Sequence, residues 1–413
     1  MEGLPRSALV VGLARSGQAA ALALARRGVR VVGIDRRSAL DVGRLGEAGV
    51  EVHVGTEDEE LVEAMELVIK SPGVPGEAPP IARARRLGVP VWSEVELGYR
   101  LLPGVEIVAV TGTNGKTTTS ELLGVILGAP VAGNVGRALS ELDGVVAAGR
   151  VVCEVSSFQL EDVHEFRPRA AVLLNLEADH LDRHGTFDAY RDAKLRVFEN
   201  QVSGEVAVVP RGFGPVPGSA RRVEFGDSDP LPAEPRIPGA HNRENAAAAT
   251  AVARALGVPD DAIARGLASF PGVPHRLELV REVGGVRFVN DSKATNVAAA
   301  LRGLAAYAEP LHLILGGSLK GESFAPLARG IRERGGVRSV LLVGEARDEL
   351  AAALDAEGLG YERAGTLDRA VSAAVGAARN GDVVLLSPAC ASYDQFANFE
   401  ERGDEFRRLV AAL

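Results

Sequence analysis

The stretch Val108-Ala109-Val110-Thr111-Gly112-Thr113-Asn114-Gly115-Lys116-Thr117-Thr118-Thr119 decides the fold, because an apolar strand here runs into a glycine-rich turn and then into a helix. Such a turn lets backbone N–H groups point at phosphate oxygens, helped by the helix N-terminus. Lys116 would hold the β- and γ-phosphates of ATP, and the Thr117 hydroxyl can ligate Mg²⁺. The predicted phosphate site comprises Gly112, Thr113, Asn114, Gly115, Lys116, Thr117 and Thr118.

The turn departs from the strict phosphate-loop pattern at one position. That pattern needs a glycine five residues before Gly115, where this chain has Val110. The alternative is therefore a glycine-rich turn of structural use only. The strand before the turn and the helix after it favour the phosphate site.

Length and composition are those of a multidomain globular protein. The 413 residues predict about two to four domains, and 46% apolar with 24% charged residues is typical of globular chains. The net charge of −9 argues against a nucleic-acid partner. No apolar run is long enough to predict membrane insertion, and the start of the chain has the pattern of a strand rather than of a secretion signal. Two cysteines, Cys153 and Cys390, fit a reducing cytoplasm, where we expect a monomer.

Lysine is scarce in this chain, and arginine supplies most of the positive charge. Four of the five lysines lie inside polar or glycine-rich motifs. Because lysine is a compact point charge that can lose its proton when buried, these positions are candidates for chemistry. The lysines are Lys70, Lys116, Lys194, Lys293 and Lys320.

Three α/β segments follow one another along the chain. Residues 1–103 begin with a strand, a glycine turn, a helix and a second strand, which is the opening of a Rossmann-like unit. Residues 104–272 contain the phosphate turn and predict a central ATPase domain of the P-loop type. Residues 273–413 again alternate strands with helices and predict a second Rossmann-like domain. We therefore expect an α/β protein of three domains with mostly parallel sheets.

Acidic and imidazole side chains follow two predicted strands of the central segment. Glu154 follows the strand 151–153, and the polar run 175–184 follows the strand 170–174. Ligands bind at the carboxyl ends of strands in open α/β sheets. Oxygen ligands with one imidazole suit Mg²⁺ or Mn²⁺ better than zinc. A solvated turn that caps the next helix is the alternative.

Lys194 and two asparagines leave a choice between structural and functional roles. Lys194 lies on a predicted amphipathic helix, residues 190–198. It is either a surface lysine or a partly buried lysine that is neutral and can be modified. Asn242 precedes an alanine-rich helix and is either its N-cap or, with Asn245, a contact to the nucleotide base.

Polar turns also follow the strands of the last segment. In Asn290-Asp291-Ser292-Lys293-Ala294-Thr295-Asn296, capping of the next helix explains Asp291 or Thr295 but not the whole set. The second glycine-rich turn, Gly316-Gly317-Ser318-Leu319-Lys320-Gly321, lacks the phosphate-loop spacing. The small and hydroxyl-bearing residues from Ser387 onward either serve packing alone or bind the carboxylate of a ligand.

The first segment carries an imperfect dinucleotide pattern. In Gly12-Leu13-Ala14-Arg15-Ser16-Gly17, Ala14 replaces the middle glycine. Asp35 ends the second strand, where a ribose contact normally falls. Arg36-Arg37 and the turn Lys70-Ser71-Pro72-Gly73-Val74 suggest instead another phosphate-bearing ligand.

In this order, the motifs resemble those of the Mur ligase family of peptidoglycan synthesis across essentially the whole chain. The Thr-Gly-Thr-Asn-Gly-Lys-Thr loop at 111–117 marks that family, and the runs 154–160, 291–296 and 387–402 resemble the member that adds D-glutamate. The resemblance implies a UDP-binding N-terminal domain, a central ATP-binding domain and a C-terminal domain that brings the amino acid. Its implied substrates are UDP-N-acetylmuramoyl-L-alanine, D-glutamate and ATP.

The resemblance also implies a role for each matched position. The catalytic residues would be Lys116, Glu154, His180 and Lys194. The UDP substrate would be held by Ser16, Asp35, Arg36, Arg37, Ser71, Gly73 and Asn134. ATP would also contact Asn242, Asn245, Arg276 and Asp291. D-glutamate would be held by His180, Thr295, Lys320, Ser392 and Phe399. One Mg²⁺ would be ligated by Thr117 and Glu154, and a second by Glu154, His180 and a carbamylated Lys194. The residues that depart from the family pattern, beside the amino-acid pocket, are Ser318 and Tyr393.

The chemistry fits these residues. A carboxylate is a poor acyl donor, so ATP must first convert it to an acyl phosphate. Two Mg²⁺ ions and Lys116 would neutralise the charge on the transferring phosphoryl group. An amine with a pKa of about 8 or above is mostly protonated at neutral pH and needs a base. His180 is a candidate base that metal ligation would weaken. Because the three ligands belong to three domains, the resemblance also predicts domain closure.

Alternatives of two kinds stay open. Another Mur ligase, or a folylpolyglutamate synthase-like ligase, would share the ATP loop, although the UDP-type first domain argues against the latter. A non-catalytic nucleotide-binding regulator would bind or slowly hydrolyse ATP, indifferent to amino acids.

Overall fold

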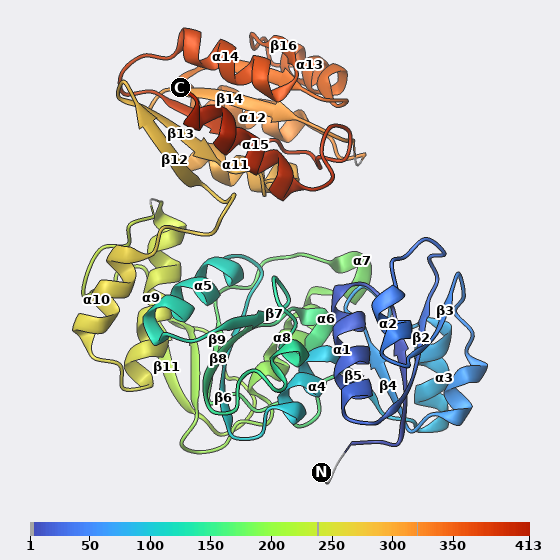
Figure 1. Ribbon diagram of the computed structural model, residues 1–413. Helices are drawn as coiled ribbons and strands as arrows, with labels where there is room; N and C mark the ends of the chain where they lie inside the picture. The colour runs from blue at the N-terminus through green and yellow to red at the C-terminus, as the bar shows by residue number, and fades with distance from the viewer. Residues whose placement is uncertain (1–3, 238, 320) are drawn as a thin grey trace. The chain divides into compact units, whose positions relative to one another are not determined.

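The computed structural model describes residues 4–237, 239–319 and 321–413. The chain forms two compact units. The first unit contains Met1–Pro235 and His241–Phe270, and the second contains Arg236–Ala240 and Pro271–Leu413. The first unit holds two sheets and the second holds one (Figure 1).

The first sheet has five parallel strands in the order β3-β2-β1-β4-β5. They are β1 (Ser7–Val11), β2 (Arg30–Asp35), β3 (Glu51–Val54), β4 (Leu67–Lys70) and β5 (Val91–Ser93). Its helices are α1 (Arg15–Arg26), α2 (Gly43–Glu47), η1 (Glu60–Ala64), α3 (Pro79–Leu87) and α4 (Glu94–Leu101). Because successive side chains of a strand point to opposite faces, Val10 packs with α1, α2 and α4, whereas Val11 packs with α3 and η1. Helices therefore cover both faces of this sheet.

The second sheet has six parallel strands in the order β11-β10-β9-β6-β8-β7. They are β6 (Val105–Thr111), β7 (Val131–Gly133), β8 (Gly149–Glu154), β9 (Ala170–Leu173), β10 (Val206–Pro210) and β11 (Arg221–Phe225). Its helices are α5 (Lys116–Leu127), η2 (Leu139–Leu142), α6 (Ser157–Leu160), α7 (Leu181–His184), α8 (Phe187–Leu195), η3 (Arg196–Phe198), α9 (Ala240–Ala255) and α10 (Asp260–Ser269). Since β6 lies between β8 and β9, the turn after β6 is flanked by the ends of both neighbours.

The third sheet has the order β12-β13-β17-β14-β15-β16, and only the edge pair β12 and β13 is antiparallel. Its strands are β12 (Glu278–Val283), β13 (Val286–Asn290), β14 (Leu311–Gly316), β15 (Val337–Val343), β16 (Glu362–Gly365) and β17 (Val383–Leu386). Its helices are α11 (Val297–Ala305), α12 (Ala325–Arg334), α13 (Arg347–Ala356), α14 (Leu367–Ala377) and α15 (Phe399–Ala411). Leu313 packs with α11, α12 and α13, and its neighbour Ile314 packs with α14 and α15. This sheet, too, is covered on both faces.

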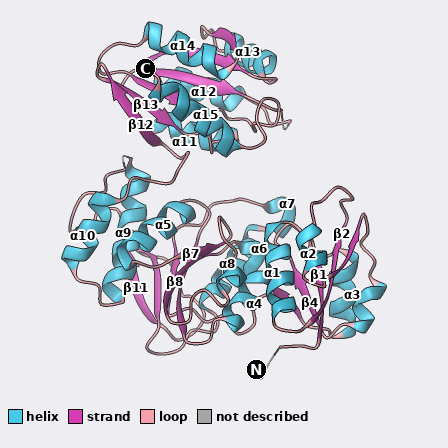
Figure 2. Ribbon diagram, viewed as in Figure 1, coloured by secondary structure: helices cyan, strands magenta, loops and turns pink. Residues whose placement is uncertain are grey.

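The predicted fold class is confirmed. All three sheets are parallel or nearly so, and helices connect most of the strands, as Figure 2 shows in cyan and magenta. The predicted helix 190–198 ends earlier than expected, because its last turn tightens into the short helix η3. Across the described ranges, no helix combines the length and apolar character that a membrane crossing requires.

Candidate active site

The phosphate turn joins β6 to α5, and two glycines allow its shape. Gly112 has φ 152° and Gly115 has φ 82°, which are backbone conformations that other residues rarely adopt. A Cβ on Gly115 would lie 2.2 Å from Asn245 Oδ1, and one on Gly112 would lie 2.9 Å from Leu174 Cβ. Glycine is therefore required where α9 and the end of β9 approach the turn.

The segment after β9 holds the turn from its other side. The Asn114 backbone N–H donates to Asn175 Oδ1 at 2.8 Å, and the Thr113 N–H donates to the Asn175 carbonyl at 3.1 Å. Asn114 Nδ2 also donates to Glu177 Oε2 at 3.0 Å. These bonds organise the turn in advance of any ligand.

Two lysine ammonium groups share one carbonyl oxygen of the turn. Lys116 Nζ donates to the Gly112 and Thr113 carbonyls, each at 2.9 Å. Lys194 Nζ, on α8, donates to the same Gly112 oxygen at 2.8 Å and lies 4.7 Å from the centre of the Tyr190 ring. Burial and, secondly, the charge of Lys116 lower the pKa of Lys194 from 10.5 to about 7. The turn therefore gathers positive charge that phosphate oxygens can neutralise.

Glu154 and Thr117 bring oxygen atoms to the same end of the sheet. Glu154 ends β8 opposite Val110 of β6, and its side chain is buried. Its Oε1 accepts from Asn134 Nδ2 at 2.9 Å. Thr117 is buried in the first turn of α5. A carboxylate and a hydroxyl are the oxygen ligands that suit Mg²⁺.

His180 lies beside this region, just before α7. Its backbone has φ 52° and its side chain is 48% exposed. The centre of its ring lies 4.9 Å from that of Phe158 and 6.5 Å from that of Tyr190. Among the residues that the structure describes, no three His, Cys, Asp or Glu side chains are grouped as a metal site.

A cavity of about 390 Å³ lies at the carboxyl ends of β1, β2 and β4. Ser71 Oγ donates to the Gly12 carbonyl at 2.6 Å, and Asp35 Oδ2 accepts from the Leu13 N–H at 2.7 Å. Hydrogen bonds from Arg37 lower the pKa of Asp35 from 3.8 to about 2. The structure brings together all seven residues predicted to hold the UDP substrate, which line this cavity: Ser16, Asp35, Arg36, Arg37, Ser71, Gly73 and Asn134.

In the second unit, Asp291 follows β13 and its carboxylate is buried. Ser387 Oγ donates to Asp291 Oδ2 at 2.8 Å, and the Leu277 N–H donates to Oδ1 at 3.3 Å. Burial raises the pKa of Asp291 from 3.8 to about 7, against the opposing charge of Arg276. The carboxylate therefore joins the ends of β13 and β17 while it is partly protonated at neutral pH.

A buried arginine, Arg402, joins the turns that lie next to residues predicted to bind D-glutamate. Arg402 donates from Nε to Ser292 Oγ at 2.9 Å, and from Nη2 to the Ser292 and Cys390 carbonyls at 2.9 and 3.1 Å. Its Nη1 donates to the Ala391 carbonyl at 3.1 Å. Ser292 Oγ in turn donates to the Phe399 carbonyl at 2.8 Å. Arg402 thus connects the turns after β13 and β17 to the start of α15.

The described residues of the second unit that are predicted to bind D-glutamate lie near these turns. Ser392 is buried just after the β17 turn, and the Phe399 ring lies 6.1 Å from the His275 ring, centre to centre. The Thr295 N–H donates to the Lys293 carbonyl at 2.9 Å. Lys320, also predicted to hold D-glutamate, lies outside the described residues.

Several structural alternatives from the sequence are wrong. Asn296, rather than Asp291 or Thr295, caps α11, because its Oδ1 accepts from the Ala299 N–H at 2.8 Å. Asn242 lies inside α9 and is buried, so it is not the cap of that helix. The surface alternative for Lys194 fails because that side chain is also buried.

Two residues of these regions were not singled out from the sequence. Tyr190 lies one helical turn before Lys194, and its hydroxyl hydrogen-bonds to Thr113 Oγ1 at 2.8 Å. The spacing of four on an amphipathic helix was a usable signal for this residue. Arg402 gave no such signal, because arginine is also the ordinary surface cation of this chain.

Three family models match the chain along its length. The MurD-like N-terminal domain of Mur ligases matches residues 6–93, the Mur ligase middle domain matches residues 110–212, and the Mur ligase glutamate ligase domain matches residues 275–390. The solved UDP-N-acetylmuramate-alanine ligase MurC of Thermotoga maritima is 18% identical, with a TM-score of 0.60 over 99% of this chain and 100% of that chain. The fold is therefore that of the ATP-dependent Mur ligases.

Curated relatives cover nearly the whole chain. The UDP-N-acetylmuramoylalanine--D-glutamate ligase of Anaeromyxobacter dehalogenans (strain 2CP-C) is 46% identical over 97% of this chain and 96% of its own. The ligase of that name from Myxococcus xanthus (strain DK1622) is 42% identical over 98% of both. The chain belongs to the Mur ligase family.

Proposed function

We propose that the chain is an ATP-dependent acid–amino-acid ligase that joins D-glutamate to UDP-N-acetylmuramoyl-L-alanine. The observation that carries the proposal is the convergence of Lys116 and Lys194 on the Gly112 carbonyl, in a turn flanked by Glu154. The relatives that are named for this activity support the choice of substrates. The product would serve peptidoglycan precursor synthesis, and so cell shape and division, in the cytoplasm.

Each domain would bind one substrate. Residues 1–103 would bind the UDP substrate, residues 104–272 ATP, and residues 273–413 D-glutamate. The cavity at β1, β2 and β4 supports the first assignment, because Arg36 and Arg37 on its lining offer charge to a diphosphate. Asn134 lines the same cavity and also donates to Glu154, so the acyl end of the substrate would reach toward the phosphate turn.

The reaction would proceed in two displacements. An oxygen of the substrate carboxylate attacks the γ-phosphorus of ATP, the bond from that phosphorus to ADP breaks, and an acyl phosphate forms. The neutral amine of D-glutamate then attacks the acyl carbon, a base takes the proton that the nitrogen loses, and phosphate leaves with the oxygen that the carboxylate supplied. Lys116 would hold the γ-phosphate throughout, since its ammonium already lies against the turn.

The oxygen atoms of Thr117 and Glu154 fit a Mg²⁺ ion, because both are buried at the phosphate turn. When bound, the ion would neutralise phosphate charge. A second Mg²⁺, or Mn²⁺, would be held by Glu154, His180 and a carbamylated Lys194. The lowered pKa of Lys194 supports the carbamate, because only the neutral amine reacts with carbon dioxide.

The second unit would supply Arg276 and Asp291 to ATP, alongside Asn242 and Asn245 of α9. D-glutamate would be held by His180, Thr295, Lys320, Ser392 and Phe399. The network around Arg402 supports this assignment, because it fixes the turn that carries Ser392 and the start of α15.

The proposal is tested by phosphate release from ATP in the presence of UDP-N-acetylmuramoyl-L-alanine, with single amino acids varied. D-glutamate should give phosphate well above the level with L-glutamate or with buffer. Equal release with all three would refute the proposed substrate, and release without any amino acid would favour a simple ATPase.

A further inference from the structure

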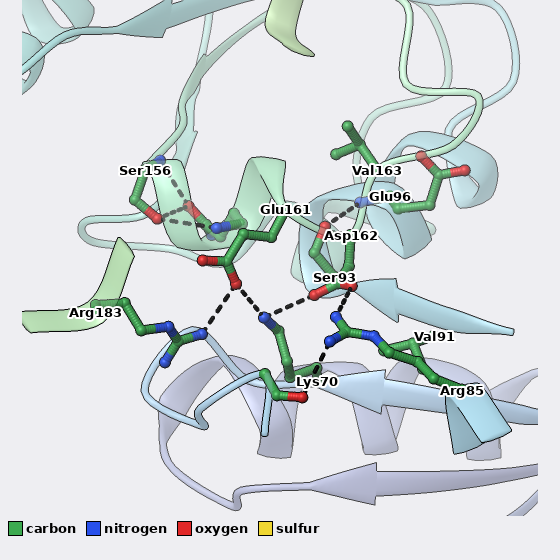
Figure 3. Close-up of polar contacts among 12 residues, drawn as sticks. Lys70, Arg85, Val91, Ser93, Glu96, Ser156, Glu161, Asp162, Val163 and Arg183 are labelled. Carbon is green, nitrogen blue, oxygen red and sulfur yellow. Dashed lines mark hydrogen bonds and ion pairs between the residues drawn. The ribbon is translucent and has the colours of Figure 1, made fainter. Parts of the chain in front are cut away.

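Lys70, the last residue of β4, is a fully buried lysine outside the sites described above. The turn 70–74 in the sequence suggested that it faces a phosphate-bearing ligand, yet its side chain does not line the cavity. Its Nζ lies instead 2.6 Å from Glu161 Oε2 and 2.7 Å from Asp162 Oδ2. Figure 3 shows the ammonium between these two carboxylates, which belong to the central domain. A side chain of the first sheet is thus anchored in the second domain of the same compact unit.

The Lys70 contacts connect two parts of the proposed active site. On one side, the next residue, Ser71, lines the cavity and donates to the Gly12 carbonyl. On the other side, Glu161 accepts from Arg183 Nη2 at 3.0 Å and lies 3.6 Å from His184 Nδ1. Arg183 and His184 form the end of α7, the short helix that His180 precedes. The ion pair between buried Lys70 and half-buried Glu161 therefore links the cavity wall to the helix that His180 precedes.

Each of the two carboxylates that contact Lys70 has a second cationic partner, so the Lys70 charge can be removed by mutation. Burial alone would raise the pKa of Glu161, but the charges of Lys70 and Arg183 hold it below its ordinary value, so the carboxylate is ionised. Asp162 has a second cation, because Arg85 Nη2 lies 2.9 Å from its Oδ1. Removal of the Lys70 charge would leave each carboxylate with an arginine partner. A variant at this position should therefore still fold, since neither acid is left buried and unpaired.

A purely structural role is the ordinary interpretation of a buried ion pair, and the molecule offers a comparison for it. Arg100 on α4 also pairs across to the central domain, with Nη1 3.1 Å from Glu165 Oε2, and it pairs within α4, with Nε 2.7 Å from Glu96 Oε1. Arg100 does not line the cavity and has no contact with α7 among the ion pairs and hydrogen bonds of the described residues. The Lys70 pair therefore lies between the cavity wall and α7, whereas the Arg100 pair adjoins neither of them.

We propose that Lys70 is a positioning residue, which sets the wall of the UDP-substrate cavity relative to α7 and His180 through its ion pair with Glu161. The inference rests on the proposed function of the cavity and of His180. It assigns no contact between Lys70 and a substrate. Loss of the ion pair should loosen the cavity wall while the ATP turn, held by Asn175, stays in place.

The test compares Lys70→Met with Arg100→Met in the D-glutamate-dependent phosphate assay. For Lys70→Met we expect the KM for UDP-N-acetylmuramoyl-L-alanine to rise about tenfold, as for a typical coupling within an ion-pair network, with the KM for ATP changed by less than about twofold. For Arg100→Met both KM values should stay within about twofold. Thermal unfolding of both variants reports their stability. An unchanged KM for the UDP substrate in Lys70→Met, or an equal rise in Arg100→Met, would overturn the inference.

Glu161→Gln supplies a second, independent arm. It keeps the size of the side chain but removes the charge that Lys70 contacts, so it should raise the same KM. The double variant Lys70→Met/Glu161→Gln should be no worse than the single variants, because both remove one link. Additive effects, about a hundredfold in all, would contradict a shared link. A wild-type enzyme without D-glutamate-dependent phosphate release would refute the proposed function, whereas an active wild type with indifferent variants would refute this inference alone.

Discussion

Lys194 in the first unit and Asp291 in the second are both buried, and burial moves the pKa of each to about 7, from opposite sides. Their surroundings differ. Asp291 accepts hydrogen bonds from Ser387 and Leu277, which suit a carboxylate. Lys194 shares the Gly112 oxygen with another ammonium group, that of Lys116. The Asp291 carboxylate is thus satisfied by hydrogen bonds from other segments of its own unit, whereas the phosphate turn brings two lysine amino groups to one oxygen, where a bound anion would stabilise their positive charge.

The largest effect is expected at Lys116. Lys116→Ala should lower kcat by about 10²–10³-fold, since one preorganised charge on the transferring phosphoryl group is lost. Circular dichroism should be unchanged, and binding of UDP to the first-domain cavity should persist. Turnover within tenfold of wild type would contradict the role of this lysine and remove the contrast between the two turns.

Lys194 should come next, and it distinguishes a cation from an anion at this position. If Lys194 acts as a carbamate, Lys194→Ala should lose about a hundredfold in kcat and regain part of it with a small carboxylate such as acetate, which can replace a metal-ligating oxygen. Lys116→Ala is the matched control, because a carboxylate cannot replace an ammonium group. Rescue of neither variant would leave the carbamate without support, and rescue of both would contradict it.

The pH dependence of stability should have opposite signs at the two positions. With a folded pKa of about 7 against 10.5, Lys194 binds fewer protons folded than unfolded, so its contribution is lost as pH falls from 10.5 to about 7. With a folded pKa of about 7 against 3.8, Asp291 binds more protons folded, so its contribution is lost as pH rises from 3.8 to about 7.

These signs are measured as the Tm of each variant minus that of wild type, without ligands. The difference for Lys194→Met should become more positive as pH falls from about 10.5 to about 7, and that for Asp291→Asn should become more positive as pH rises from about 3.8 to about 7. Parallel trends in both variants would contradict the assignment of opposite shifts.

The smallest effect is expected at Ser318, one of the departures from the family pattern. Its Oγ donates to Asp394 Oδ1 at 3.2 Å and accepts from the Asp394 N–H at 2.8 Å. Because these hydrogen bonds are exposed to solvent, Ser318→Ala should cost about 1 kcal/mol, or about 2–4 °C in Tm, and leave the KM for D-glutamate within about twofold. A larger change in that KM would place Ser318 in the amino-acid pocket.

The sequence predicted those features of the fold that depend on residues close together in the chain. The strand, turn and helix at Thr111–Lys116 were predictable because backbone geometry and glycine placement are local, and the parallel α/β architecture followed from the alternation of such units. The cavity residues Asp35 and Ser71 were predictable for a related reason, because Asp35 ends one strand of a parallel sheet and Ser71 directly follows another.

Pairings between distant parts of the chain could not be predicted in this way. Lys70 pairs with Glu161, 91 residues away, and Arg402 with Ser292, 110 residues away. Nothing near either cation in the sequence distinguishes it from a ligand-binding or a surface charge. Only the packing of one domain against the next, or of one turn against another, selects these partners.

The central claim, that the phosphate turn makes an acyl phosphate, is tested most directly by oxygen transfer. UDP-N-acetylmuramoyl-L-alanine labelled with ¹⁸O in its carboxylate is turned over with ATP and D-glutamate, and the released phosphate is analysed by mass spectrometry. The account predicts one ¹⁸O atom in each phosphate, because the carboxylate oxygen leaves with it. Unlabelled phosphate would show that the hydrolysis of ATP and the joining of the amino acid do not pass through an acyl phosphate.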